Sequence, residues 1–350
     1  MTYLDILNET QKRYIKVLSK EVPVFLLDYL ETKPMKRIDE VGCGCGTDYV
    51  KMFERKFYYT NLYHSLGVAL IIWNFTHDKA QTLAGLFHDI STPALKHCVD
   101  FMNGDYEKQE STEELTTKMI AESDEIMSLL IRDGVTLDEV KDYHIYPIAD
   151  NETPRLCADR LEYTFSHGYC SDSVWDIDTV KSIYDDISVY KNEDGQDELG
   201  FKRVESAEKF ISGASVLWRF WIDANDKLTM QMYADLMKKM NEYGEITIDD
   251  LYKVPEKEII NRIENSKIEE VRNAFKLFKE QKQAYESDEY VENKYCKSIK
   301  TKRRYINPLV MDKGGTVLRG KDVSEAINHQ IEDYFKFDTK KYLYFDFDFK

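Results

Sequence analysis

The chain of 350 residues lacks an apolar run long enough to cross a membrane, because a spanning helix needs about 20 such residues. The longest apolar stretch, LGVALIIWNF at residues 66–75, is only about half that length. The first residues, MTYLDILNETQKRYIK, also lack the basic segment and apolar core of a secretory signal. These absences argue against a membrane protein, and we expect a cytoplasmic one.

Positive charge and cysteine are also scarce. Lysine and arginine total 48 against 64 aspartate and glutamate residues, which gives a formal net charge of −16. This excess repels long polyanions and disfavours extended nucleic-acid binding, whereas a small anionic nucleotide can still bind where cations and a metal gather. The six cysteines form neither a disulfide framework nor a zinc-finger spacing. Whether the chain forms a homo-oligomer is left open.

Apolar residues recur mostly at helical spacing, so the sequence predicts a mainly α fold. Helices are expected at residues 2–31, 61–76, 78–88, 111–132, 154–167, 203–222, 226–243, 255–265 and 268–285. Residues 294–310 and 340–350 alternate as strands do, and the polar stretch 183–200 is interpreted as a boundary or an exposed loop. The predicted layout is a helical domain at 1–185, followed by a helical extension with a small β element at 186–350.

A His-Asp pair, His88 and Asp89, ends the apolar segment LAGLFHDI and prompts a search for further metal ligands. A divalent ion needs several nitrogen or oxygen donors that converge from different elements. The spacing between His64 and His88 is enough for a helix, a turn and a return helix. The two histidines can therefore meet at adjacent helix ends, and Asp159 in RLCADRLEYTF offers a fourth donor.

The order His, His-Asp, Asp in a helical setting resembles the HD-domain metal-dependent phosphohydrolases. YYTNLYHSLGVAL is similar to their helix with the first histidine, and LAGLFHDI is similar to their His-Asp helix. Within this superfamily, HDISTPALKHCVD and ADRLEYTFSHGY resemble segments of the deoxynucleoside triphosphate triphosphohydrolases. The resemblance covers residues 35–170 and implies an HD-domain helical bundle.

The resemblance also implies a metal centre. His64, His88, Asp89 and Asp159 would hold one divalent ion, with Mn, Fe, Co, Mg, Ni and Zn all open as its identity. Such an ion lowers the pKa of a bound water and polarises a phosphoryl oxygen. The expected activity is hydrolysis of a phosphoester or phosphoanhydride of a nucleotide by metal-activated water.

Four further residues receive roles from the same resemblance. His97 and Asp100 are three apart and share a helix face, so together they would act as a general acid or a phosphate contact. Arg160 would neutralise phosphate charge, and Tyr163 would pack against the sugar.

The chain also departs from the triphosphohydrolase pattern. Thr92 stands where that group commonly has a histidine, and Asn61 stands where a basic residue usually precedes the first metal histidine. Only Lys108 or Gln109 occupies the region of a further catalytic histidine. These departures keep a second hypothesis open, a nucleotide-binding regulator that retains the metal but has lost turnover.

Three other motifs invite functional interpretations. RIDEVGCGCGTDYV at residues 37–50 looks like the glycine-rich motif of S-adenosylmethionine-dependent methyltransferases, but no alternating strands and helices follow it. A loop before the helical core is therefore preferred. The basic run KTKRR at residues 300–304 could bind phosphates or the end of a nucleic acid, but its alternation favours a solvated strand face. The second His-Asp pair, at His77 and Asp78, is interpreted as a turn between helices.

Overall fold

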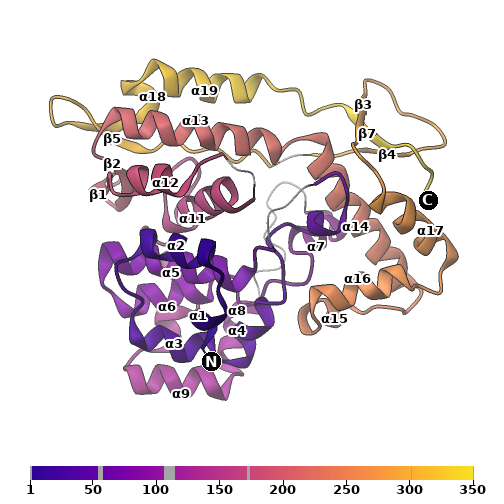
Figure 1. Cartoon of the computed structure of the whole chain (residues 1–350), viewed down its shortest axis with the longest axis horizontal. Helices are drawn as coiled ribbons and strands as arrows, with labels where there is room; N and C mark the ends of the chain where they lie inside the picture. The colour runs from indigo at the N-terminus through magenta and orange to yellow at the C-terminus, as the bar shows by residue number, and fades with distance from the viewer. Residues whose placement is uncertain (1, 54–57, 106–114, 172–173, 301, 350) are drawn as a thin grey trace.

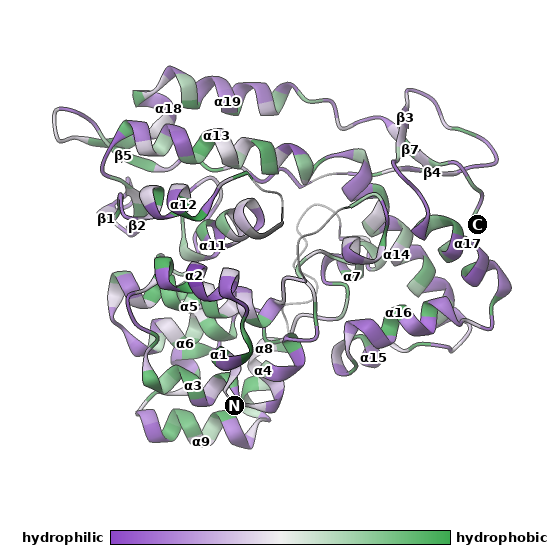
Figure 2. Cartoon of the chain, in the orientation of Figure 1, coloured by the Kyte–Doolittle hydropathy of each residue, from purple (hydrophilic) through white to green (hydrophobic). Residues whose placement is uncertain are grey.

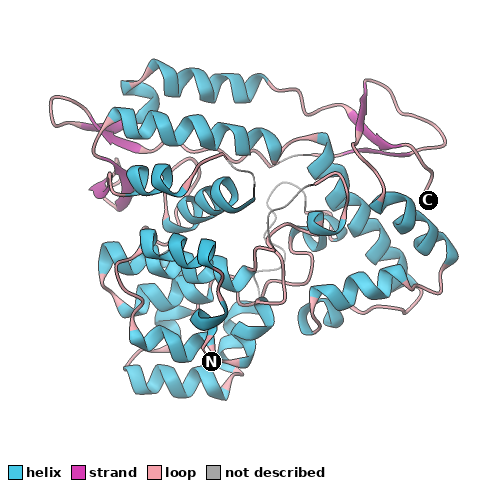
Figure 3. Ribbon diagram, in the orientation of Figure 1, coloured by secondary structure: helices cyan, strands magenta, loops and turns pink. Residues whose placement is uncertain are grey.

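Helices dominate the computed structural model, which describes residues 2–53, 58–105, 115–171, 174–300 and 302–349 (Figure 3). The mainly α prediction is confirmed. The helices of the first half are α1 Tyr3–Ile6, α2 Glu9–Leu18, α3 Val24–Leu30, α4 Lys33–Ile38, α5 Asn61–Thr76, α6 Lys79–Phe87, α7 His97–Met102, α8 Thr116–Ala121, α9 Asp124–Asp133, α10 Leu137–Val140, α11 Ala158–Ser166 and α12 Ile177–Tyr184. Those of the second half are α13 Val204–Phe220, α14 Ala224–Glu242, α15 Ile248–Lys253, α16 Glu256–Glu264, α17 Glu269–Lys279, α18 Gly320–Val323 and α19 Glu325–Lys336.

The predicted helices agree with the structure best where the sequence is most apolar. The helix expected at residues 61–76 is α5, with the same bounds. The helix expected at 111–132 is divided into α8 and α9, because Ser123 caps the second helix by accepting a hydrogen bond from the Ile126 amide at 3.3 Å. Residues 111–114 of that prediction lie outside the described part of the chain.

The β structure is more extensive than predicted and lies in two places (Figure 1). The stretch 183–200, interpreted as a loop or boundary, instead contains most of a hairpin of β1 Ile187–Lys191 and β2 Asp197–Phe201. These strands join β5 Leu309–Met311 and β6 Val317–Arg319 in a sheet of order β1-β2-β5-β6. A second sheet, of order β3-β7-β4, is formed by β3 Tyr285–Ser287, β4 Tyr295–Ser298 and β7 Tyr342–Phe345. The predicted strands at 294–310 and 340–350 are therefore only partly strands.

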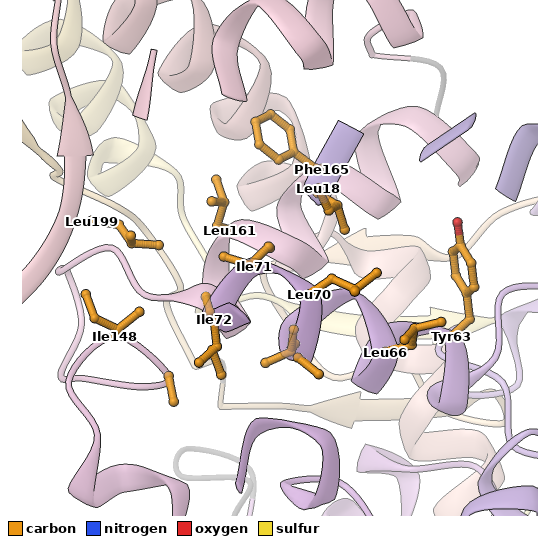
Figure 4. Close-up of a cluster of buried hydrophobic side chains, with 14 of the residues drawn as sticks. Leu18, Tyr63, Leu66, Leu70, Ile71, Ile72, Ile148, Leu161, Phe165 and Leu199 are labelled. Atoms are coloured by element: carbon orange, nitrogen blue, oxygen red, sulfur yellow. The ribbon is translucent and has the colours of Figure 1, made fainter. Parts of the chain in front are cut away.

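Two clusters of buried apolar side chains form the interior. The larger cluster joins the N-terminal helices to α13 and α19, and Figure 4 shows the part of it around α5. The smaller cluster packs α7 against α14, α16, α17 and β7. Both clusters combine residues from either side of position 185, and the domain boundary placed there stays a prediction.

Helix α5 is buried on every side over residues 61–72, which explains why its sequence is apolar from Leu66 to Trp73. It packs against α2, α4, α6 and α11, and Figure 2 shows hydrophobic residues concentrated on α5 and its neighbours. Among the described residues, no helix combines the length and apolar character needed to span a membrane. Helix α5 is thus a core helix that fixes the positions of the elements around it.

A buried carboxylate connects the C-terminal half to two N-terminal loops. Glu256 begins α16, and its Oε2 atom accepts hydrogen bonds from the amides of Leu95 at 3.0 Å and Gly42 at 3.3 Å. Its Oε1 atom accepts a hydrogen bond from the Tyr58 hydroxyl at 3.0 Å. Burial, only partly opposed by these hydrogen bonds, raises the pKa of Glu256 to about 7.

This raised pKa predicts a pH-dependent stability. Between pH 4.5 and about 7 the unfolded chain ionises Glu256 while the folded chain keeps it protonated, so rising pH favours unfolding. Across this pH interval, the unfolding free energy of the wild type should fall by up to about 3 kcal/mol more than that of Glu256→Gln. Urea unfolding at about pH 5 and about pH 8 measures the difference.

Glu258→Gln is the matched control, because Glu258 lies on the same helix and pairs with Arg262 near the surface. It should keep the pH dependence of the wild type. An unfolding free energy of Glu256→Gln that changes with pH as the wild-type value does would contradict the prediction.

Candidate metal centre

Four predicted ligands converge where three helices meet. His64 lies in the first turn of α5, and His88 ends α6 with Asp89 directly after it. Since α5 and α6 pack closely across the turn at residues 77–78, the start of one meets the end of the other. Asp159 comes from the first turn of α11, whose start is fixed by hydrogen bonds from the amides of residues 158 and 159 to the carbonyls of 148 and 149.

The donor atoms lie within reach of a single ion. His64 Nε2 is 3.2 Å from His88 Nε2, 3.1 Å from Asp159 Oδ1 and 3.9 Å from Asp89 Oδ2. His88 Nε2 is 3.6 Å from each of the same two carboxylate oxygens. His64, His88 and Asp89 form a group whose ligand atoms all lie within 4.8 Å of one another. The structure therefore brings all four predicted ligands together.

The hydrogen bonds made by the outer nitrogens of the two imidazoles direct their inner nitrogens toward the ligand carboxylates. His64 Nδ1 lies 2.5 Å from the Glu162 carboxylate, and His88 Nδ1 lies 2.8 Å from the Gly85 carbonyl. Both partners are acceptors, so each Nδ1 carries a proton and donates it. In the neutral rings, two Nε2 lone pairs then face each other beside two carboxylates. This set of donors fits a divalent cation.

In the metal-free protein, a proton on His64 Nε2 supplies part of the positive charge that a metal ion would bring. Burial alone would lower the pKa of His64, but the carboxylates of Glu162 and Asp159 raise it to about 10. Burial would likewise raise the pKa of Asp159, but the hydrogen bond to His64 lowers it to about 2. His64 and Asp159 therefore form a charged pair, and metal binding requires the loss of the His64 Nε2 proton.

Glu162, which the sequence did not single out, orients the first histidine. Its fully buried carboxylate contacts His64 Nδ1 and accepts hydrogen bonds from the hydroxyls of Tyr59 at 2.7 Å and Tyr14 at 3.2 Å. Gly67 makes room for it, because a Cβ there would lie 2.6 Å from Glu162 Oε1. The available signal was spacing, since Glu162 is three residues after Asp159 on α11.

His97 and Asp100 form the predicted pair, with His97 Nδ1 at 2.9 Å from Asp100 Oδ2. The other ring nitrogen, Nε2, lies 3.5 Å from Nη2 of Arg304. Burial, together with the positive charge of Arg304 and despite the hydrogen bond to Asp100, lowers the pKa of His97. The neutral ring can accept a hydrogen bond at Nε2, whereas a general acid would need a proton there. The catalytic role of the pair stays a prediction.

Arg160 and Tyr163 lie beside the metal centre in different ways. The Arg160 guanidinium holds the turn before α11, by donating hydrogen bonds to the Asn151 carbonyl and amide oxygens and to the Arg155 carbonyl. The Tyr163 ring packs edge-on against Trp221 at a centroid distance of 5.3 Å. Arg160 therefore has a clear structural role, and contact of either residue with a substrate stays a prediction.

One cavity of about 980 Å³ connects these residues. Seven of the eight predicted site residues line it, and Asp100 lies buried behind His97. Thr92 also lines the cavity, whereas Lys108 and Gln109 lie outside the described residues. The cavity therefore joins the predicted metal ligands to the predicted substrate residues.

The basic run KTKRR, which lies outside the metal pattern, also reaches this cavity. Lys302 and Arg304 of the basic run line it, while Arg303 between them turns away and donates hydrogen bonds to the Tyr334 and Phe337 carbonyls. Residues 302–304 are not in a strand, so the interpretation of this run as a strand face was wrong, while the solvation of Lys302 and Arg304 stays a prediction. Alternation along the extended segment was the signal that separated them from Arg303.

The glycine-rich segment at residues 37–50 begins at the end of helix α4, where a methyltransferase would have a strand. Among the described residues, the sheets show no doubly wound parallel arrangement. The methyltransferase alternative therefore has no structural support. The interpretation of His77 and Asp78 as a turn is confirmed, since Asp78 caps α6 and accepts a hydrogen bond from the Gln81 amide.

Comparisons with known proteins include one relative that is named as a metal-dependent phosphohydrolase. No protein-family model matches the chain. It is 26% identical over 291 residues to the uncharacterized protein YdhJ of Bacillus subtilis, over 81% of this chain and 83% of that protein. It is also 26% identical over 153 residues to the metal-dependent phosphohydrolase cns2 of Cordyceps militaris, over 42% of this chain and 41% of that protein.

Two solved structures share the fold. A hypothetical protein from Aquifex aeolicus matches with a TM-score of 0.63 and 15% identity, over 93% of both chains. A phosphohydrolase from Bacteroides thetaiotaomicron matches with a TM-score of 0.65 and 14% identity, over 93% of this chain and 96% of that one. At these identities the likeness shows the fold alone, and it extends over nearly the whole chain.

The contact between Glu162 and His64 predicts that a change of Glu162 lowers metal affinity while all four candidate ligands remain. Glu162→Gln can no longer hold the Nδ1 proton of His64 with a negative charge, so the imidazole becomes a weaker and less fixed ligand. Mn²⁺ affinity, measured by titration of metal-free protein, should fall by about 10- to 100-fold. Asp186→Asn is the control, because it removes another buried carboxylate, which pairs with Arg203 on the hairpin side of the fold. Equal Mn²⁺ affinities for Glu162→Gln and the wild type would contradict this assignment.

Proposed function

We propose that the protein is a metal-dependent phosphohydrolase of the HD type that cleaves a phosphoester or phosphoanhydride bond of a nucleotide. The observation that carries the proposal is the convergence of His64, His88, Asp89 and Asp159, with both histidine Nε2 atoms on the inner side. The named relative cns2 and the Bacteroides phosphohydrolase support the same class. When bound, a divalent ion would lower the pKa of a water and polarise a phosphoryl oxygen.

The cavity beside the ligands supports an anionic substrate. Its volume of about 980 Å³ suits a nucleotide, and its basic side chains are Lys96, Arg155, Arg160, Lys227, Lys302 and Arg304. Apart from the two ligand carboxylates, its acidic side chains are Asp150, Glu152, Asp194 and Asp226. Cations thus exceed the remaining acids in the described lining, although acids exceed cations in the chain as a whole.

Aromatic side chains in the same lining support a ligand with a base or a sugar. Tyr59, Tyr143, Tyr163, Phe220 and Trp221 all line the cavity, and such rings stack on planar or apolar ligand surfaces. A neutral His97, held by Asp100, would accept a hydrogen bond from the substrate. The deoxynucleoside triphosphates are the first substrates to test, because the sequence resembles their hydrolases.

A product assay tests the proposal. Nucleoside mono-, di- and triphosphates are incubated with the purified protein and Mn²⁺, Fe²⁺, Co²⁺ or Mg²⁺, and released phosphate, pyrophosphate or triphosphate identifies the bond that is cut. We expect hydrolysis by the wild type and its loss, together with Mn²⁺ binding, in His88→Ala/Asp89→Asn.

The second His-Asp pair provides the matched control. His77→Ala/Asp78→Asn changes the same two residue types in a turn outside the cavity lining, and asparagine keeps the helix cap. This variant should keep both metal binding and hydrolysis. Wild-type protein that binds Mn²⁺ and nucleotide without hydrolysing any member of the panel would instead support the nucleotide-binding regulator, which the departures at Asn61 and Thr92 motivate.

A further inference from the structure

The turn between the metal ligands and α7 has an unusual backbone. Leu95 has a φ of 66°, and Lys96 has a φ of 42° with a ψ of −117°. The Lys96 angles lie outside the left-handed helical region, so they strain any residue with a Cβ and suit glycine. Residues with side chains keep such conformations mainly at functional sites, where the surrounding structure enforces them.

The C-terminal half of the chain holds this turn in place. The Ala94 amide donates a hydrogen bond to the Leu251 carbonyl at 2.7 Å, and the Leu95 amide donates one to Glu256 Oε2 at 3.0 Å. Both acceptors belong to α15 and α16, far along the sequence. The strained conformation of Lys96 is therefore fixed by tertiary contacts immediately before it.

The Lys96 side chain extends from this turn into the metal centre. Its Nζ atom lies 3.1 Å from Asp89 Oδ2, the ligand oxygen, and 2.5 Å from Asn61 Oδ1. The side chain is 13% exposed and lines the cavity. An ammonium on a ligand carboxylate competes with a metal ion for negative charge, so metal affinity does not explain this lysine.

We propose that Lys96 is a catalytic residue that binds a non-bridging oxygen of the phosphoryl group undergoing hydrolysis. This inference rests on the proposed function. In the reaction, a water oxygen forms a bond to phosphorus and loses a proton to the leaving oxygen or to solvent. The bond to the leaving oxygen breaks with its electron pair staying on that oxygen, and Lys96 keeps its own proton. Negative charge on the non-bridging oxygens is stabilised by the fixed ammonium.

This role gives the site a second positive centre beside a single metal ion. Two-metal phosphohydrolases stabilise an in-line displacement with two cations a few ångströms apart. Here the ammonium lies at the ligand carboxylate, so one divalent ion and Lys96 would supply both charges. The backbone strain is then the structural cost of bringing the side chain to this place.

Binding measurements with Lys96→Met test the proposal apart from turnover. Methionine removes the charge and keeps much of the length of the side chain. Micromolar Mn²⁺ is titrated into metal-free protein, and inorganic phosphate is then titrated into the Mn²⁺-loaded protein. We expect Mn²⁺ affinity equal to or above that of the wild type, and phosphate affinity at least about 10-fold lower. Lys79→Met, which removes a lysine paired with Asp133 outside the cavity lining, should leave both affinities unchanged.

The outcomes separate this inference from the proposed function. With any nucleotide that the wild type hydrolyses, Lys96→Met should lower kcat/KM by about 100-fold or more. Unchanged phosphate affinity, or a wild type that binds no phosphate, overturns the role of Lys96. Weaker Mn²⁺ binding by Lys96→Met would mean that Lys96 only supports Asp89, and would also overturn it. A wild type that binds phosphate through Lys96 but hydrolyses no nucleotide overturns the proposed function and not the phosphate contact.

Lys96→Gly checks the argument from strain. Glycine relieves the backbone conformation and removes the ammonium, so this variant should unfold at the wild-type temperature or above it while binding phosphate as weakly as Lys96→Met. A lower unfolding temperature with wild-type phosphate affinity would show that Lys96 acts in folding alone, and would overturn the proposal.

Discussion

The site depends on two imidazole nitrogens that face each other at 3.2 Å, His64 Nε2 and His88 Nε2. Such a contact is unfavourable between neutral rings with lone pairs, and it needs a proton or a cation between or beside them. The outer nitrogens are already committed to the Glu162 carboxylate and the Gly85 carbonyl, so the rings have little freedom to turn away. The helix arrangement thus produces a group of donors that fits a cation, through the orientation of the rings as much as through the identity of the residues.

The rest of the interior accommodates this constraint. Glu162 lies fully buried, where an isolated carboxylate would be costly. Its charge is compensated by hydrogen bonds from the Tyr14 and Tyr59 hydroxyls and by the proton that His64 holds because of its raised pKa. The absence of a side chain at Gly67 lets α11 place this carboxylate against α5. Helices α2, α5 and α11 therefore meet around the hydrogen bond between Glu162 and His64.

The sequence predicted the parts of this arrangement that are local. The position of α5 follows from its apolar run at residues 66–73, and the four candidate ligands follow from their order along the chain and from the HD-domain resemblance. The hairpin of β1 and β2 was missed because its polar turn dominates the composition of the segment. The sequence did not identify Arg304 as a neighbour of His97, or Glu256 as a support of the turn at Leu95. In each pair the two residues lie more than a hundred positions apart. Helix periodicity describes which residues are buried and does not identify contacts at that range.

The contribution of the C-terminal half shows why the site extends beyond the region with the recognisable motifs. A backbone such as that of Lys96 costs about 1 to 3 kcal/mol, a large part of the net stability of a typical domain. Two buried hydrogen bonds, from the turn to Leu251 and to Glu256, each contribute about 1 kcal/mol and offset much of this cost. A glycine at position 96 would remove the strain and make both supports unnecessary. The arrangement is therefore best explained by the position that it gives to one ammonium group, 3.1 Å from a metal-ligand oxygen.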